Sequence, residues 1–212
     1  MPFADHTVGE FLGAIRSSNP TPGGGSASAL AGAMGASLLT MVARLPKSKA
    51  TTAEDTARLT AAGDRCAALA QELELLVERD SDAYNQVLAA YKLPKGTDDE
   101  KAARSAAIQA GFRAAIAAPL DVMRACAAAA EQGVVVARLG LASASSDVQV
   151  GVALLATALR GAKLNVETNL GSVKDAAYRS EVQSEMQGCE RAIAREIAAA
   201  RGIARNEELR ST

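Results

Sequence analysis

The feature that most constrains the fold of this chain is an apolar repeat that runs without a proline from about Thr52 to Tyr91. Its members recur at steps of three and four residues, which is the spacing of one face of an α-helix. They are Leu59, Cys66, Leu69, Leu73, Leu76, Val77, Tyr84, Val87, Leu88 and Tyr91. The repeat predicts one long helix whose apolar stripe faces a core over many turns.

One carboxylate falls inside this stripe. Asp80 lies four residues after Leu76 and four before Tyr84, whereas Glu78 and Asp82 point elsewhere and are predicted to be surface charges. A carboxylate on an inward face is costly unless it is paired, hydrogen-bonded or protonated. Periodicity alone leaves two interpretations open. Asp80 is either a structural group, in an ion pair with a neighbouring helix or where the stripe opens to solvent, or a functional one.

A second unusual stretch reads Asn-Pro-Thr-Pro-Gly-Gly-Gly-Ser over residues 19–26 and leads into a run of small residues. The prolines impose a non-helical approach, and the glycines permit positive φ and leave backbone N–H groups uncovered. The small residues predict a helix from about Ser26 to Leu45, whose N-terminal donors favour an anion. The alternative is a tight turn before a closely packed helix. The stretch matches neither a Walker A loop nor a dinucleotide fingerprint, because no Gly-Lys-Ser/Thr follows and no strand precedes it.

The remaining segments also have helical spacing. Further helices are expected over residues 8–15, from a capping box at 97–100 onward, from a Ser146-Asp147 cap to about Leu170, and from Ser172 or Asp175. Pro119 should kink or split the helix in which it lies. Asn165 and Asn169 place two carboxamides on one helix face amid small residues. Such a pair could read the edge of a heterocycle or tie helices together.

The composition favours an all-α fold. Alanine is abundant, aromatic residues make up 3% and tryptophan is absent, which suits closely packed helices better than a sheet. No internal repeat or linker divides the chain. Residues 1–212 are therefore expected to form a single domain, a mostly antiparallel bundle of about six long helices.

Charge and rare residues narrow the function. A net charge of −1 gives no basic footprint for nucleic acid and no polybasic membrane patch. The three cysteines lie about sixty residues apart and His6 is the one histidine, which argues against a zinc knuckle, a His-based zinc site and an internal Ser-His-Asp triad. No metal is expected, and His6 is predicted to face solvent. Without a signal peptide or long apolar span, the expected location is the cytoplasm.

Taken in order, the motifs of this chain resemble the cyclodeaminase/cyclohydrolase family of folate enzymes. That family includes stand-alone bacterial methenyltetrahydrofolate cyclohydrolases and the C-terminal domain of formiminotransferase-cyclodeaminase. The motifs are Pro-Thr-Pro-Gly-Gly-Gly-Ser at 20–26, Asp80 with Ala83-Tyr84, Leu93-Pro94-Lys95, Pro119-Leu120, Ser146-Asp147, and Asn165-Val166 with Asn169. The resemblance covers nearly the whole chain, and residues 93–104 look especially like the stand-alone cyclohydrolases. One departure is Gly140-Leu141, where the family commonly has Gly-Asn.

The resemblance implies an all-helical homodimer that binds a tetrahydrofolate derivative and needs no further cofactor. It implies hydrolysis of 5,10-methenyltetrahydrofolate to 10-formyltetrahydrofolate, with ammonia-releasing formiminotetrahydrofolate cyclodeaminase activity as the alternative. A non-catalytic helical scaffold is a second alternative, which fits the apolar stripes but poorly explains a carboxylate within one.

The same resemblance gives roles to individual residues. Asp80 is the expected base, and Lys95 would stabilise the leaving nitrogen or meet a folate carboxylate. Asp147, Asn165 and Asn169 are candidates for the pterin edge. The other residues expected at the substrate are Pro22, Gly23, Gly24, Gly25, Ser26 and Tyr84.

Overall fold

The computed structural model describes residues 3–211, and every regular element in that range is helical. The elements are a 3₁₀ turn η1 (Phe3–Asp5), α1 (Val8–Ile15), α2 (Gly24–Arg44), α3 (Ala53–Tyr91), α4 (Asp98–Leu139), a 3₁₀ turn η2 (Ala142–Ala144), α5 (Ser145–Leu170) and α6 (Ala176–Ser211). The predicted all-α bundle is confirmed, with α1 as its short member and five long helices.

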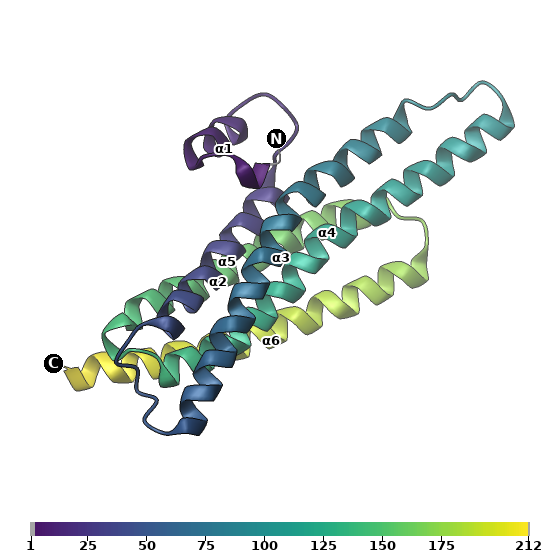
Figure 1. Ribbon diagram of the computed structural model, residues 1–212. Coiled ribbons are helices and arrows are strands. Elements are labelled where there is room, and N and C mark those ends of the chain that lie inside the picture. The colour runs from purple at the N-terminus through teal and green to yellow at the C-terminus, as the bar shows by residue number, and fades with distance from the viewer. Residues whose placement is uncertain (1–2, 212) are drawn as a thin grey trace.

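The long helices lie side by side and alternate in direction (Figure 1). α3 and α4 form a hairpin whose turn projects beyond the rest of the bundle, and α1 lies near the end at which α2 begins. α2 packs against α3 and α5, whereas α6 packs against α4 and α5. This arrangement brings the start of α2, the second half of α3 and the end of α5 together.

Small residues let α2 and α5 approach closely, as the sequence predicts. A Cβ atom added to Gly35 would lie 2.7 Å from the carbonyl oxygen of Gly151, and one added to Gly161 would lie 2.2 Å from Ser28 Oγ. Both distances are far below the 3.5–4.0 Å at which carbon atoms pack favourably. A larger side chain at Gly35 would meet backbone and push the two helices apart, whereas one at Gly161 would displace the Ser28 hydroxyl.

Three details differ from the sequence-based predictions. α4 continues through Pro119 as one helix. α5 begins at Ser145, so Ser146 and Asp147 lie within its first turn and the N-cap residue is Ala144, which makes no side-chain cap. His6 is half-buried against the ring of Phe3, and its Nδ1 has no hydrogen-bond partner among the described residues.

The expectation of no long apolar span also needs correction. α2 and the segment Ala142–Leu170 are long and apolar enough, by length and composition alone, to cross a membrane. In the fold, α2 lies between α3 and α5, and α5 packs against α2, α4 and α6. Their apolar character is therefore accounted for by helix packing within the bundle.

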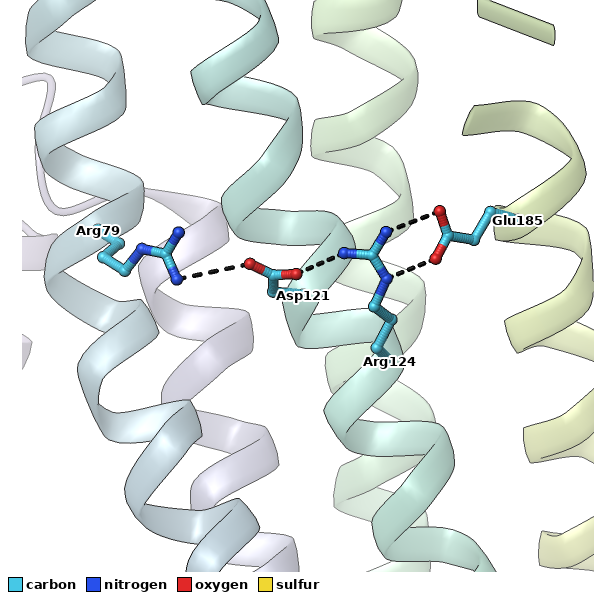
Figure 2. Close-up of polar contacts among 4 residues, drawn as sticks. All are labelled: Arg79, Asp121, Arg124 and Glu185. Atoms are coloured by element: carbon cyan, nitrogen blue, oxygen red, sulfur yellow. Dashed lines mark hydrogen bonds and ion pairs between the residues drawn. The ribbon is translucent and has the colours of Figure 1, made fainter. Parts of the chain in front are cut away.

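A chain of ion pairs on the outside of the bundle joins α3, α4 and α6 (Figure 2). Arg79 contacts Asp121 at 3.5 Å, and Arg124 contacts Asp121 at 2.5 Å. Arg124 also donates to both carboxylate oxygens of Glu185, at 2.5 and 2.7 Å. These side chains are between a quarter and three-fifths exposed, so each pair contributes modestly to stability.

Candidate active site

A cavity of about 210 Å³ lies where the start of α2 meets α3, α4 and the end of α5. It is lined by Pro20, Thr21, Gly23, Gly24, Gly25, Asp80, Tyr84, Ala115, Asn165, Thr168 and Asn169. We call this space the Asp80 cavity. It collects residues from two segments singled out in the sequence, together with both asparagines of α5.

Gly25 allows the Asp80 carboxylate to approach the backbone of α2. A Cβ atom on Gly25 would lie 2.1 Å from Asp80 Oδ1 and 2.4 Å from its Cγ, closer than any real side chain could stand. The glycine is therefore needed for space. The predicted need for positive φ is not met, because no glycine in residues 3–211 has a positive φ. Gly23, for example, is the N-cap residue of α2 and is extended, with φ −122°.

The anion expected at the N-terminus of α2 is thus a side chain of the protein itself. Asp80 accepts hydrogen bonds from both the hydroxyl and the backbone of Ser26, in the first turn of α2. Helix N-termini favour negative charge because their first N–H groups have no partner within the helix. This contact explains how a carboxylate can lie on the inward stripe of α3.

The ion-pair interpretation of Asp80 is wrong, since no Arg or Lys among the described residues pairs with it. Burial raises the pKa of Asp80 above its ordinary value, and the hydrogen bonds from Ser26 oppose that rise without cancelling it. A half-buried carboxylate with no counter-charge is a group able to accept a proton or to attract a cation.

Ser26 lies behind Asp80 and does not line the cavity. It is fully buried, and its Oγ lies 3.2 Å from Asp80 Oδ2, 2.8 Å from the carbonyl oxygen of Val77 and 3.2 Å from Ser81 Oγ. A hydroxyl has one proton, so Ser26 can donate to Val77 or to Asp80 at any moment, but not fully to both. Its position is that of a partner for Asp80, which sequence reasoning interpreted as a substrate contact.

The two asparagines have their amide nitrogens engaged by backbone carbonyls. Asn165 Nδ2 donates to the Gly161 oxygen at 2.9 Å, and Asn169 Nδ2 donates to the Ala115 oxygen at 2.9 Å. Their side-chain oxygens accept no hydrogen bond from any residue in the described part of the chain. The Asp80 carboxylate and these two amide oxygens are therefore acceptor groups available in the cavity lining.

Pro119 explains why the Ala115 carbonyl is available. In an α-helix the carbonyl of residue 115 would accept from the N–H of residue 119, and proline has no N–H. Buried carbonyls nearly always find another partner, and here the partner is Asn169. Sequence reasoning could have found Ala115 from this spacing but did not.

The structure brings together most of the predicted site residues, but not all of them. Pro22 is buried beside the cavity without lining it, and Tyr84 lines it while remaining 41% exposed. Lys95 lies in a different hollow, beyond the end of α3. Asp147 lies eighteen residues before Asn165 on α5, roughly 27 Å along the helix. The roles predicted for Lys95 and Asp147 stay predictions.

Two residues of the cavity, Ala115 and Thr168, were not singled out from the sequence. Pro20 and Thr21 belong to the 20–26 motif but were not among the expected substrate contacts. Thr168 adjoins Asn169, and its hydroxyl donates to the Leu164 carbonyl at 2.8 Å, a bond ordinary for a helical threonine. Among the side chains that the structure describes, no group of three His, Cys, Asp or Glu residues is arranged to hold a metal ion.

A cavity with a half-buried carboxylate that has no counter-charge, set in an all-α bundle, is typical of an enzyme active site. The profile of the family described as formiminotransferase-cyclodeaminase matches residues 7–188. The chain belongs to this family.

Individual relatives fall into two groups. Methenyltetrahydrofolate cyclohydrolase from Methylorubrum extorquens is 38% identical over 184 residues, covering 87% of this chain and 88% of that protein. Formimidoyltransferase-cyclodeaminase from Sus scrofa is 33% identical over 176 residues, which cover 83% of this chain but 32% of the relative. The chain thus spans about a third of the formimidoyltransferase-cyclodeaminase.

The fold also matches a solved structure. The crystal structure of formiminotetrahydrofolate cyclodeaminase from Thermotoga maritima superposes with a TM-score of 0.81. The alignment covers 95% of this chain and 97% of that one, with 24% sequence identity. At this identity the likeness establishes the shared helical fold.

Proposed function

We propose that this protein is a cyclohydrolase that converts 5,10-methenyltetrahydrofolate to 10-formyltetrahydrofolate. The observation that carries the proposal is Asp80, a half-buried carboxylate without a counter-charge at an acceptor-lined cavity. The methenyl group is a cationic amidinium carbon held between N5 and N10. A cation of this kind supplies the charge that Asp80 lacks, and ionised Asp80 would stabilise it in return.

Family membership supports the same reaction. The cyclohydrolase relative aligns over 88% of its own length, so the match involves almost the entire protein. The formimidoyltransferase-cyclodeaminase relative aligns over 32% of its length. The match to nearly all of a cyclohydrolase supports cyclohydrolase activity more directly than the match to a third of a larger enzyme supports deaminase activity.

The proposed chemistry uses Asp80 as a general base. Water adds to the amidinium carbon and transfers one proton to the Asp80 carboxylate, which leaves a neutral carbinol bridging N5 and N10. The C–N5 bond then breaks as N5 receives the proton held by Asp80. The carbinol hydroxyl releases its proton to solvent as it becomes the formyl carbonyl. The net products are 10-formyltetrahydrofolate and one proton.

The hydrogen bond donated by the Ser26 hydroxyl would change partner as Asp80 gains and loses its proton. While Asp80 is ionised, the Ser26 hydroxyl can donate to it, and when Asp80 is protonated the hydroxyl can turn to the Val77 carbonyl instead. The change needs only a rotation of one O–H bond. The side-chain oxygens of Asn165 and Asn169 would accept hydrogen bonds from N–H groups of the pterin ring.

The decisive test is Asp80→Asn, with loss of methenyl absorbance as the measurement. Loss of a general base typically lowers the rate by about a hundred- to ten-thousand-fold, and we expect a loss of that size. Asp82→Asn is the matched control, because Asp82 is the exposed carboxylate two residues away. Circular dichroism of both variants checks the fold. Near-normal hydrolysis by Asp80→Asn would remove Asp80 from the mechanism.

The alternative is cyclodeaminase activity, which the formimidoyltransferase-cyclodeaminase relatives at 30–33% identity favour. In that reaction N10 attacks the formimino carbon and ammonia leaves, so the cavity must supply a proton where hydrolysis needs a water. Incubation with each purified substrate distinguishes the two. Ammonia release from the formimino compound, without hydrolysis of the methenyl compound, would favour the deaminase. Failure to bind any reduced folate in calorimetry would support a non-catalytic scaffold.

We further propose that the protein is a homodimer, formed through the apolar face of α2. Met34 and Met41 on this face are 48% and 41% exposed, and they border a hollow lined mainly by apolar residues of α2 and Leu154 of α5. Exposed apolar patches of this kind commonly mark protein interfaces. Light scattering of the purified protein should give twice the chain mass, and a monomer would contradict the proposal. A cytoplasmic location and the absence of a further cofactor stay predictions.

A further inference from the structure

Pro119 is a buried proline inside α4 that lies one helical turn from the Asp80 cavity. It does not line the cavity, to which α4 contributes Ala115, four positions earlier. The proposed reaction gives Pro119 no role. Its effect on the cavity passes through the main chain of α4 to Asn169 on α5, which does line the cavity.

The ring of Pro119 changes what the Ala115 carbonyl can bind. In a regular α-helix this oxygen would accept from the N–H of residue 119, but proline has no N–H and crowds the carbonyl four residues before it. The Asn169 side chain reaches across from α5 and donates from Nδ2 to this oxygen at 2.9 Å. The side-chain hydrogen bond therefore replaces a main-chain hydrogen bond that α4 lacks.

This contact fixes the direction in which the Asn169 amide faces. A carbonyl oxygen only accepts hydrogen bonds, so the amide must turn its nitrogen toward Ala115. The amide oxygen accepts no hydrogen bond from any described residue, and it is the group left for a ligand. Asn169 consequently presents an acceptor, which selects a ligand that carries an N–H or O–H group at this position.

Asn165 is held less firmly than Asn169. Its Nδ2 donates to the Gly161 carbonyl at 2.9 Å. Gly161 lies within α5, four residues before Asn165, so its carbonyl also has the main-chain N–H of Asn165 as a regular helical donor. That carbonyl does not depend on the side chain, whereas the Ala115 carbonyl has lost its regular donor. The amide of Asn169 is thus the more strongly oriented of the two.

We propose that Pro119 is a positioning residue of the Asp80 cavity, which acts by holding the Asn169 oxygen toward the substrate. This inference rests on the proposed function, because the group that donates to this oxygen is an N–H of the pterin ring. In Pro119→Ala the N–H of residue 119 returns to the Ala115 carbonyl, as in a regular helix. The Asn169 amide then loses its fixed partner and can turn its nitrogen toward the cavity, where it would face the donor of the substrate.

The first experiment follows the Asn169 side-chain amide by nuclear magnetic resonance in the free protein, so that it needs no substrate. In the wild type, the Asn169 amide protons should exchange with solvent more slowly than those of Asn85, an exposed asparagine of α3. Pro119→Ala should remove this protection. Pro119→Val also has an N–H but is closer to proline in volume, and it should remove the protection too. Agreement between the two variants would identify the N–H, and not a space left by the ring, as the cause.

The second experiment measures hydrolysis of 5,10-methenyltetrahydrofolate. Pro119→Ala should raise KM about fivefold, the size of one neutral hydrogen bond, and leave kcat near the wild-type value, because the contact is made in the ground state and the transition state alike. In an Asn169→Ala background the same substitution should have no further effect. Pro46→Ala, at an exposed proline just past the far end of α2, is the matched control and should change neither quantity.

The two experiments separate this inference from the proposed reaction. Loss of amide protection in Pro119→Ala, in a protein that hydrolyses no methenyl compound, would keep the orientation of Asn169 by Pro119 and reject the proposed function. Protection that survives in both variants of residue 119 would overturn the inference, as would an unchanged KM in a protein that hydrolyses the substrate. A KM that rises equally with and without the Asn169 side chain would also overturn it, because a proline needed only for packing behaves in that way.

Discussion

Two adjacent residues of α3, Arg79 and Asp80, have opposite charges and lie in different environments, one on the surface and one at the cavity. Arg79 points outward and belongs to the ion-pair chain with Asp121, Arg124 and Glu185 (Figure 2). Asp80 points inward, has no ionic partner among the described residues, and is held by Ser26. The surface charges satisfy one another and stabilise the packing of three helices. The inward carboxylate has hydrogen bonds from Ser26 but no counter-charge, and it is therefore free to accept a proton.

The largest expected loss of activity comes from a substitution that crowds the Asp80 carboxylate. In Gly25→Ala the new Cβ would occupy the place of the Asp80 carboxylate, so α2 and α3 must separate or Asp80 must turn away. A displacement of about 1 Å at a reacting group can cost roughly a hundredfold in rate, and we expect at least that loss of cyclohydrolase activity. Overpacking should also lower the free energy of unfolding by about 1–3 kcal/mol, measured by urea denaturation.

Gly188→Ala provides the matched control for this substitution. Gly188 also lies in a helix, but a Cβ added there meets nothing within 4 Å. Activity should stay at the wild-type level, and stability should rise slightly because alanine favours the helix. Equal effects of the two substitutions would show that contact with Asp80 is not the cause.

The next effect is the pH dependence that burial gives to Asp80. Protonated Asp80 cannot accept a proton from water, so kcat/KM should fall about tenfold per pH unit below the pKa of the free protein. Because burial raises that pKa above the ordinary 3.8, the decline should begin at a higher pH than for an exposed aspartate. A bound amidinium cation lowers the pKa, so the decline of kcat should lie at a lower pH. Coincident profiles would argue against contact between Asp80 and the cation.

Removing the hydroxyl behind Asp80 should have a smaller effect. Ser26→Ala removes a hydrogen bond that favours the ionised carboxylate, worth about 1 kcal/mol, or somewhat less than one pKa unit. The inflection of the kcat/KM profile should therefore move upward by up to roughly one unit. Ser184→Ala, at an exposed serine of α6, should leave the profile unchanged. A serine that only packs would lower stability without moving the inflection.

The smallest effect is expected from breaking the outward network. Arg124→Ala removes its contacts to Asp121 and Glu185 and should lower the free energy of unfolding by about 1 kcal/mol, as exposed ion pairs do. Hydrolysis should be unaffected, because none of the four residues of the network lines the Asp80 cavity. Arg191→Ala, an exposed arginine of α6, should change neither quantity. A large loss of activity in Arg124→Ala would mean that the surface ion-pair network affects the environment of Asp80.

Most of the fold could be predicted because helical periodicity is a local property. The limits of α2 and α3 agree with the predicted ones to within two residues, and the capping box at Thr97 and Glu100 is present. Asp80 was found because it interrupts a stripe. The reason for Gly25 was not found, because conformational freedom is visible in a sequence, whereas a contact between residues 25 and 80 is not.

The positions of Lys95 and Ser26 show a second limit. A resemblance indicates which residues belong to a site, but not the distance of each from the reacting atoms. Ser26 lies behind Asp80, and Lys95 lies in a separate hollow beyond the end of α3, outside the Asp80 cavity. Both outcomes depend on side-chain direction and on which helices end near one another, which follow from packing across the whole bundle.

Pro119 also helps to fix the position of α5 along α4. It is the single proline between residues 98 and 139, so the Ala115 carbonyl is the one oxygen on α4 that loses a helical donor to a proline ring. Asn169 supplies the missing donor. A shift of α5 by one turn would leave both groups unpaired, at about 1–3 kcal/mol for each buried group. The proline thereby sets the register of the helix that carries both asparagines of the cavity.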